Sequence, residues 1–161
     1  LSLLKSGDEV IISSNVYGGT FRVLDKVFLP FGLQYKIVDT SDLALVEASI
    51  SDQTRAILIE SPANPLMTVT DIAAVSALAK AKGVLTIVDN TFMTPYLQRP
   101  LALGADGVGI ARGMQPALKK AGEEGVYAYF RTVTNQLRGI MARTGTPTVS
   151  AMNPTVIHRI R

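Results

Sequence analysis

Short apolar runs rich in β-branched residues alternate with helical segments through the first two-thirds of this 161-residue chain. The runs span residues 9–13, 34–38, 56–59 and 84–88. The segments with helical spacing of apolar residues are 20–27, 41–49 and 71–82. Strands joined by helices of this length form βαβ units with parallel strands. The chain is therefore predicted to be an α/β protein with a mostly parallel sheet and flanking helices.

Helix boundary signals support this interpretation. Asp71 is a suitable N-cap for the helix that follows it, and Gly83 is a suitable C-terminal stop. Segment 41–49 starts with similar cap chemistry at Ser41, and Thr20 is a candidate N-cap for the first helix.

The pattern changes after Pro100. Residues 101–106 are predicted to form a short helix before a strand at 107–110, and 145–161 are expected to be loose. A long helix is predicted at 123–144. Its apolar face consists of Val126, Phe130, Val133, Leu137, Ile140 and Met141. We divide the chain into a first domain at 1–106 and a divergent βα tail at 107–161.

Charge divides near the same point. Residues 1–108 hold 8 Lys and Arg against 11 Asp and Glu, whereas residues 109–161 hold 8 against 2. A basic C-terminal third could face nucleic acid, but it has few interleaved aromatic residues and no long basic run. A solvated helical face is the favoured interpretation, and no nucleic-acid partner is expected.

Composition excludes several kinds of function. Apolar residues make up 47% of the chain, which is enough for a buried core. The absence of cysteine excludes thiolate metal sites and a cysteine nucleophile, and a single histidine, His158, argues against a histidine metal site or a Ser-His-Asp triad. No apolar run approaches the roughly 20 residues that span a bilayer. We expect a cytoplasmic protein without a metal, in which any chemistry depends on an organic cofactor.

Polar clusters follow the predicted strands, where open α/β sheets bind ligands. They lie at residues 15–20, 60–65, 89–91 and 111–114. Asp89 is either a loop carboxylate bonded to backbone amides or an anion that faces a cationic cofactor ring. Tyr17 either belongs to a simple strand-to-helix connection or offers its ring for stacking on a flat cofactor.

The remaining candidates are equally open to two interpretations. Arg22 is either an exposed helix residue or a bidentate partner for a carboxylate. The segment from Glu60 to Pro65 holds two prolines, so it forms either a structural turn or a rigid support that aims Asn64 at a ligand.

Taken together, these stretches resemble the Cys/Met-metabolism family of pyridoxal-phosphate (PLP) enzymes over about residues 1–106. That family includes cystathionine γ-synthases, cystathionine β- and γ-lyases and O-acylhomoserine sulfhydrylases. The matching stretches are S-G-D-E-V-I, V-Y-G-G-T, E-S-P-A-N-P, V-D-N-T-F-M-T-P-Y-L-Q-R-P and L-A-L-G-A-D. The resemblance implies part of the large domain of a type I PLP-enzyme fold.

The resemblance also implies roles for individual residues. Tyr17 corresponds to a tyrosine that stacks on the cofactor ring and helps to move protons, and Asp89 to the aspartate that pairs with the pyridine nitrogen. Thr91 corresponds to a residue beside that aspartate. Asn64 corresponds to an asparagine near the cofactor oxygen. Arg22 and Glu60 are expected on the substrate side, Glu60 with the less defined role.

One departure from the family pattern affects the chemistry directly. The family carries a Schiff-base lysine in an S-A-T-K segment, and the corresponding position here is Met114, within A-R-G-M. A thioether cannot form an imine. Lys119 and Lys120 follow on a predicted helix and would need a large shift to replace that lysine. The resemblance further implies that phosphate-binding residues before this segment and a C-terminal domain after it are missing.

The tail resembles a different family. The stretch L-A-L-G-A-D-G-V-G-I-A-R-G and the sequence up to about residue 152 are similar to the end of FMN-dependent barrels, namely α-hydroxy-acid oxidases and type 2 isopentenyl-diphosphate isomerases. Because L-A-L-G-A-D is common to both families, the chain is interpreted as truncated or chimeric, with the junction at that stretch.

Three functional hypotheses follow. The chain is an enzyme of sulfur amino acid metabolism by descent, with a small sulfur-containing amino acid as substrate and a homo-oligomeric parent family. Alternatively, it is a non-catalytic α/β fragment with residual PLP affinity, or a remnant that binds the phosphate of FMN. The missing lysine separates the first hypothesis from the second.

Overall fold

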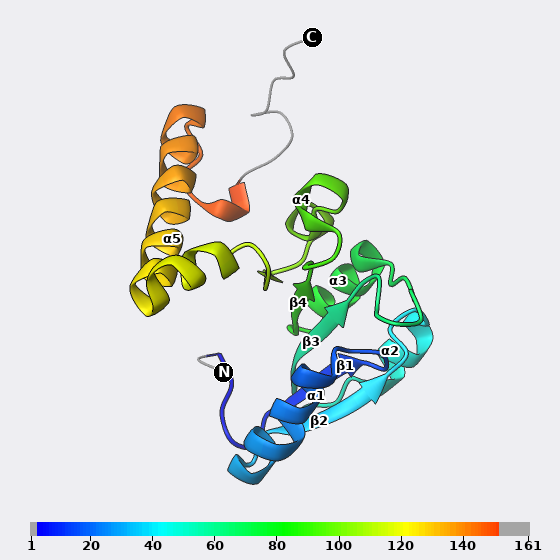
Figure 1. Ribbon diagram of the computed structural model, residues 1–161. Coiled ribbons are helices and arrows are strands. Elements are labelled where there is room, and N and C mark those ends of the chain that lie inside the picture. The colour runs from blue at the N-terminus through cyan, green and yellow to red at the C-terminus, as the bar shows by residue number, and fades with distance from the viewer. Residues whose placement is uncertain (1–2, 152–161) are drawn as a thin grey trace. The chain divides into compact units, whose positions relative to one another are not determined.

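The structure is a computed structural model that describes residues 3–151 (Figure 1). The chain divides into two compact units, Leu1–Ile110 and Ala111–Arg161. His158 and most of the tail expected to be loose lie outside the described residues.

The first unit is built on a five-stranded parallel sheet with the order β2-β1-β3-β4-β5. The strands are β1 (Glu9–Ser13), β2 (Gln34–Val38), β3 (Thr54–Glu60), β4 (Leu85–Asp89) and β5 (Gly107–Gly109). The predicted parallel α/β architecture is therefore confirmed. The strands at 9–13 and 34–38 have the predicted bounds, and β3 extends the predicted strand at both ends.

Helical segments connect the strands. They are α1 (Gly18–Val23), followed by a π-helical turn η1 (Leu24–Phe28) and a 3-10 turn η2 (Leu29–Phe31), then α2 (Leu43–Ser49), α3 (Ile72–Ala81), α4 (Thr94–Leu97) and a 3-10 turn η3 (Pro100–Leu103). The predicted helix at 101–106 is thus a shorter, tighter turn that begins one residue earlier.

The N-cap predicted for α3 is confirmed, whereas the N-caps of α2 and α1 differ from the prediction. The Asp71 side chain accepts a hydrogen bond from Ala74 N at 3.0 Å, as its N-cap position predicts. The cap of α2 is Asp42 rather than Ser41, because the Asp42 carboxylate accepts from two backbone amides. The prediction of Thr20 as N-cap is wrong, since α1 already begins at Gly18.

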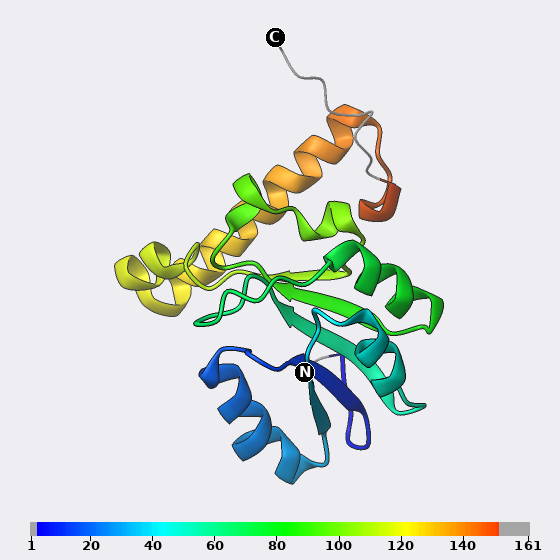
Figure 2. The ribbon, with the colours of Figure 1, turned by 90° about the vertical axis from the view of Figure 1, so that its right-hand side faces the viewer.

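Helices cover the two faces of the sheet unequally. The chain moves from β1 outward to β2 and then reverses direction to reach β3, β4 and β5. Because crossovers are right-handed, this reversal puts α1 on one face and α2 and α3 on the other (Figure 2). The core beneath α2 and α3 includes Ile11, Val46, Ile57, Val75 and Val88. The core on the side of α1 includes Val10, Ile12, Leu33 and Ala56, together with Leu24 of the turn η1 that extends α1.

The second unit contains one long helix, α5 (Gln115–Thr144), and a 3-10 turn η4 (Val149–Ala151). The backbone leaves helical geometry at Ala121 and at Gly122, whose φ is +56°. The predicted helix at 123–144 is confirmed as the part of α5 that follows this break. No residue of α5 is buried. Across residues 3–151, no helix is both long enough and apolar enough to cross a membrane.

The buried strand β3 is expected to determine the stability of the first unit. Ile57 lies in its middle and is fully buried, so Ile57→Ala should lower the free energy of unfolding by about 2–5 kcal/mol. Ile37, on the outer strand β2, is 53% exposed, and Ile37→Ala should cost about 1 kcal/mol or less. Urea unfolding followed by circular dichroism measures both. Equal losses in the two variants would contradict this assignment of the core.

Candidate functional site

The parallel arrangement places the carboxyl ends of all five strands at one edge of the sheet, the carboxyl edge. The chain reverses direction between β1 and β3, and open α/β sheets bind ligands beside such a switch point. The loops after β1, β3 and β4 carry the sequence-predicted residues Tyr17, Asn64 and Thr91. The topology therefore gathers three of the four polar clusters at one place.

Glu60 joins the loop after β1 to the end of β3. Its carboxylate Oε2 accepts a hydrogen bond from Tyr17 N at 2.5 Å, although the two residues are far apart in sequence. Glu60 is the last residue of β3 and is only 5% exposed. Its own backbone N–H donates to Ser13 Oγ at 3.3 Å, at the end of β1. The side chain thus fixes the start of the Tyr17 loop against the central strands.

Asp89 lies beside Glu60. It ends β4, and the two residues are direct partners in the parallel register of β3 and β4. The Asp89 Oδ1 atom accepts a hydrogen bond from Thr91 N at 2.9 Å, and the residue is half-buried. This contact matches the structural alternative for Asp89, a loop carboxylate bonded to a backbone amide. One carboxylate oxygen remains outside that hydrogen bond.

Two neighbouring carboxyl groups and partial burial define the electrostatics of this edge. Burial raises the pKa of Glu60 above its ordinary value. The Tyr17 N–H opposes this shift by favouring the charged form, and the adjacent Asp89 charge raises the pKa further. The backbone N–H of Asn64 also favours the charged form. A cation placed beside Asp89 would relieve the repulsion between the two groups.

The Tyr17 ring is presented at the surface. It is 61% exposed and lies at the N-cap of α1. The following turn needs glycine, because a Cβ atom on Gly19 would clash with the Tyr17 ring. The ring therefore folds over Gly19 and leaves much of its area open to a flat ligand.

Asn64 and Arg22 are less closely tied to this group. Both residues are exposed. The backbone N–H of Asn64 donates to the Glu60 carboxylate. Arg22 lies in the last turn of α1, with a guanidinium nitrogen near Gly18. Within residues 3–151, no ion pair joins Arg22 to Glu60 or Asp89.

A pair of side-chain amides, buried Asn90 and half-buried Gln98, supports the loop that starts at Asp89, and the sequence analysis does not single it out. Asn90 is 1% exposed, its Nδ2 donates to Gln98 O at 2.9 Å, and Gln98 Nε2 donates back to Asn90 Oδ1 at 2.9 Å. Gln98 also donates to Ser61 O at 2.8 Å, which ties this loop to the loop after β3. Both residues lie in the V-D-N-T-F-M-T-P-Y-L-Q-R-P stretch, and this motif was the sequence feature that could have identified them.

Hydroxyl groups form a second network under the same loops. Ser13 Oγ and Thr40 Oγ1 are 2.9 Å apart, and Thr40 Oγ1 and Thr70 Oγ1 are 2.7 Å apart. A small pocket here is lined by Ser13, Ser14, Asn15, Asp39, Thr40, Glu60, Ala63, Thr68 and Thr70. These buried contacts hold the loops after β1, β2 and β3 together and provide a rigid floor for the site.

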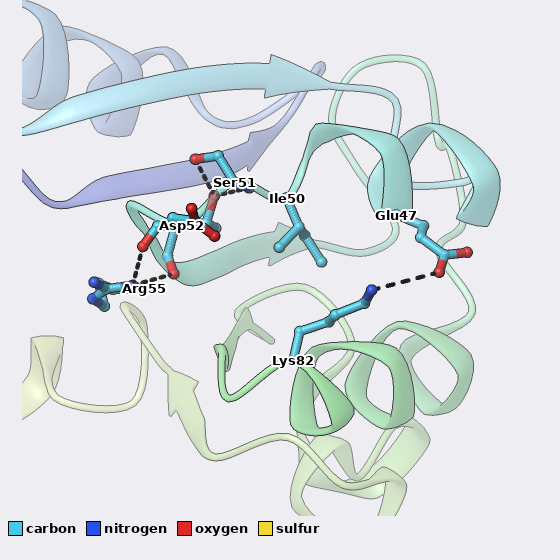
Figure 3. A pocket seen from close by; sticks show the side chains of 7 residues that line it. Glu47, Ile50, Ser51, Asp52, Arg55 and Lys82 are labelled. Carbon is cyan, nitrogen blue, oxygen red and sulfur yellow. Dashed lines mark hydrogen bonds and ion pairs between the residues drawn. The ribbon is translucent and has the colours of Figure 1, made fainter.

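A larger pocket lies at the opposite, amino edge of the sheet. Its cavity of about 290 Å³ is lined by Glu47, Ile50, Ser51, Asp52, Thr54, Arg55 and Lys82 (Figure 3). Lys82 and Glu47 are 4.0 Å apart there, and both are solvent-exposed. None of the sequence-predicted site residues lines this pocket. Within residues 3–151, no group of three or more acidic or histidine side chains is placed to hold a metal ion.

Lysines are missing from the loops of the carboxyl edge in the first unit. Its lysines are Lys5, Lys26, Lys36, Lys80 and Lys82. None lies in the loops 14–17, 39–42, 61–71 or 90–99. Met114 belongs to the second unit, where it precedes α5, and Lys119 and Lys120 are exposed on that helix.

Two protein-family models match the chain. The model for Cys/Met metabolism PLP-dependent enzymes matches residues 1–111, and the model for FMN-dependent dehydrogenases matches residues 97–159. The matches overlap across the L-A-L-G-A-D stretch. The first covers more than half of the chain, and the second is a short, partial match.

Individual relatives agree with the first model. A cystathionine beta-lyase from Lactococcus lactis subsp. cremoris (strain MG1363) is 54% identical over 106 residues, which are 66% of this chain and 28% of that relative. A cystathionine gamma-lyase from Bacillus subtilis (strain 168) is 51% identical over 106 residues, with the same coverage. The crystal structure of cystathionine gamma-lyase from Lactobacillus plantarum complexed with L-serine matches with a TM-score of 0.65 and 53% identity, over 66% of this chain and 28% of that one.

The chain therefore spans under a third of the length of these relatives. The region of similarity has the fold of part of a PLP-dependent lyase. That agreement confirms the predicted fold class.

The raised pKa of Glu60 predicts a specific pH dependence of stability. The folded state holds the Glu60 proton more tightly than the unfolded state. The contribution of Glu60 to the free energy of unfolding is therefore greatest at low pH. It is lost as the pH rises from the ordinary glutamate pKa through the raised one. The glutamine in Glu60→Gln cannot ionise, so the variant should not show this fall in the free energy of unfolding. The fall amounts to at most about 1.4 kcal/mol per pH unit.

Urea unfolding of both proteins across this pH range measures the difference. The stability of Glu60→Gln relative to the unmodified protein should increase with pH. Parallel pH profiles, or a difference that grows toward acid, would contradict the assignment of a raised pKa to Glu60.

Proposed function

The chain belongs to the family of Cys/Met metabolism PLP-dependent enzymes, and we propose that its first unit retains the half of the cofactor site that binds the pyridine ring. The observation that supports this proposal is the position of Asp89. Its carboxylate ends a central strand at the carboxyl edge, beside Glu60 and near the loop that holds Tyr17. Two adjacent carboxyl groups favour a cationic ligand, and a protonated pyridine ring is such a cation.

The residues at this edge fit the ring of PLP. Asp89 would pair with the ring nitrogen and favour its protonated form, and the Thr91 backbone N–H donates to the Asp89 carboxylate and fixes it. Tyr17 supplies an exposed aromatic face for stacking. When bound, PLP supplies a ring that accepts electrons from a carbon next to the amino group of the substrate.

The remaining proposed roles concern the rim of the site. Asn64 and Arg22 have exposed side chains. The Asn64 amide would face the oxygen of the ring, and the Arg22 guanidinium would bind a substrate carboxylate through two N–H groups. Glu60 has a structural role, because its carboxylate accepts hydrogen bonds from the backbone N–H groups of Tyr17 and Asn64. This assignment moves Glu60 from a substrate-binding residue, as the sequence suggested, to a residue that positions the Tyr17 loop.

The covalent half of the site does not fit. The family pattern places a lysine where this chain has Met114, and no lysine lies on the carboxyl-edge loops within the described part of the first unit. A thioether cannot form an imine with the cofactor aldehyde. We therefore propose that this chain alone binds the cofactor non-covalently and does not catalyse the family reaction. In a complete protein with this site, a small sulfur-containing amino acid is the substrate and the assembly is homo-oligomeric.

We further propose that the chain joins pieces of two families. The two family models overlap only between residues 97 and 111, and the two compact units meet at residues 110 and 111. The second candidate function, binding of an FMN phosphate by the turn at 111–113, is favoured only by the partial match to FMN-dependent dehydrogenases. That turn is one loop of a barrel that needs eight βα units.

Non-covalent binding predicts that the cofactor aldehyde is dispensable. PLP and pyridoxine 5′-phosphate, which has an alcohol in place of the aldehyde, should bind with dissociation constants within about threefold of each other. Asp89→Asn should weaken both by about 10–100-fold, because it removes a charge-assisted hydrogen bond of about 1.5–3 kcal/mol. Isothermal titration calorimetry measures all four affinities.

Arg55→Gln provides the matched control, because Arg55 lies at the amino edge and its loss should leave both affinities unchanged. Borohydride treatment with PLP, followed by peptide mapping, should yield no single modified lysine. A single adduct on Lys119 or Lys120 would contradict non-covalent binding, and equal affinity in Asp89→Asn would contradict the ring-binding role.

The proposed junction is tested in genomic DNA. Sequencing the codons for residues 95–115 should read through A-D-G-V-G-I-A-R-G without interruption if the fusion is natural. A genomic frame that continues from A-D into S-A-T-K would contradict a natural fusion and restore the lysine.

A further inference from the structure

Gln98 joins the two loops that carry the opposite ends of the proposed ring site. Asp89 starts the loop after β4 and would face the ring nitrogen, whereas Asn64 lies in the loop after β3 and would face the ring oxygen. Gln98 lies at the far end of the Asp89 loop, and its Nε2 donates to Ser61 O at 2.8 Å. Ser61 directly follows β3 and stands three residues before Asn64. One side chain therefore connects both ends of the site.

Both N–H groups of the Gln98 side-chain amide are used. One donates to Asn90 Oδ1 at 2.9 Å, and the other donates to Ser61 O at 2.8 Å. Both acceptors belong to buried residues, because Asn90 is 1% and Ser61 2% exposed. A buried acceptor that loses its donor is costly, so these two contacts resist any separation of the loops.

The Asn90 end of this link continues directly to Asp89. Burial alternates along β4 and through Asn90, so the Asn90 side chain faces the interior and Asp89 faces the other side of the sheet. The Asn90 backbone N–H donates to Gly109 O at 3.0 Å, and its Nδ2 donates to Gln98 O at 2.9 Å. Because β5 and Gln98 both hold Asn90, they also hold the end of β4 that carries the Asp89 carboxylate.

The Ser61 end of the link continues to Asn64 through a closely bonded loop. Ser61 Oγ accepts a hydrogen bond from Thr70 N at 3.0 Å, which closes this loop at its base. Ala63 is only 2% exposed, and its N–H donates to Thr68 O at 2.9 Å. A loop bonded to itself in this way moves as one piece, so a displacement of Ser61 displaces Asn64 as well.

We infer that Gln98 is a positioning residue that sets the spacing between Asp89 and Asn64 and thereby favours pyridine rings that carry a hydroxyl group. This inference rests on the proposed function, in which Asp89 faces the ring nitrogen and Asn64 the ring oxygen. Hydrogen bonds to two sides of one rigid ring require a fixed distance between their protein partners. Without the Gln98 amide, a ring paired with Asp89 loses its hydrogen bond to Asn64.

Two ligands separate this positioning role from general damage to the site. Pyridoxine 5′-phosphate carries the ring hydroxyl, and 3-deoxypyridoxine 5′-phosphate lacks it. Gln98→Met keeps the length of the side chain but removes both N–H groups. It should lower the preference for the hydroxylated ligand by about 2–10-fold, the contribution of one hydrogen bond, and leave the affinity for the deoxy ligand within about twofold. Isothermal titration calorimetry measures both affinities.

Three further variants complete this experiment. Asn64→Ala should lower the preference by the same factor, and the double variant with Gln98→Met should lower it no further, because both changes remove one interaction. Gln53→Met makes the matched change at the exposed amino edge and should leave both affinities unchanged. Gln98→Asn is one methylene too short to reach both acceptors. It should lose the preference in the same way and replaces Gln98→Met if that variant does not fold.

Hydrogen exchange of backbone amides tests the link between the loops without any ligand. In Gln98→Met, the N–H groups of Ala63 and Met67 in the loop after β3 should exchange about tenfold faster, as should that of Thr94 in the loop after β4. The N–H group of Thr54 at the amino edge should exchange at its original rate.

Four results would overturn the inference. An equal loss of affinity for both ligands in Gln98→Met would show a general structural role. Binding of both ligands with a preference that Gln98→Met retains would overturn the inference alone. Unchanged exchange at Ala63 and Met67 would show that the two loops move independently. An unmodified chain that binds neither ligand would contradict the proposed function, and the inference with it.

Discussion

The hydrogen bond from the Tyr17 amide to the Glu60 carboxylate holds the candidate site together. It bridges the loop after β1 and the end of β3, at the point where the chain reverses its direction through the sheet. Because Glu60 is also the register partner of Asp89, one buried carboxylate touches the loop that carries the aromatic ring and neighbours the strand that carries the second acid. The Glu60 side chain therefore fixes the start of the Tyr17 loop, while Asp89 is positioned by the backbone pairing of β3 with β4 and by the Thr91 amide.

Much of the first unit could be predicted because its signals are local. Runs of β-branched residues mark the strands, and Asp71 with Gly83 marks the limits of one helix. The motifs around Tyr17, Glu60 and Asp89 were assigned to strand ends, and parallel packing necessarily brings such ends to one edge. Local chemistry and one topological rule were sufficient for the fold class and for the gathering of these motifs at one edge of the sheet.

Contacts between distant residues could not be predicted from these signals. The resemblance implied a substrate-side role for Glu60, and nothing near Glu60 in the chain indicates that its carboxylate accepts a hydrogen bond from the Tyr17 amide. The pairing of Asn90 with Gln98 depends equally on how the Asp89 loop folds back. The break in α5 is different, because Gly122 gave a local signal and the predicted helix begins directly after it, at residue 123.

We propose that the first unit binds the cofactor ring at the carboxyl edge of its sheet. Backbone amide NMR with ¹⁵N-labelled protein, titrated with pyridoxine 5′-phosphate, tests this claim most directly. The largest chemical-shift changes should fall in residues 15–19, 60–64 and 89–91. Changes confined to the amino-edge pocket around Arg55 and Lys82, or to α5, would contradict it.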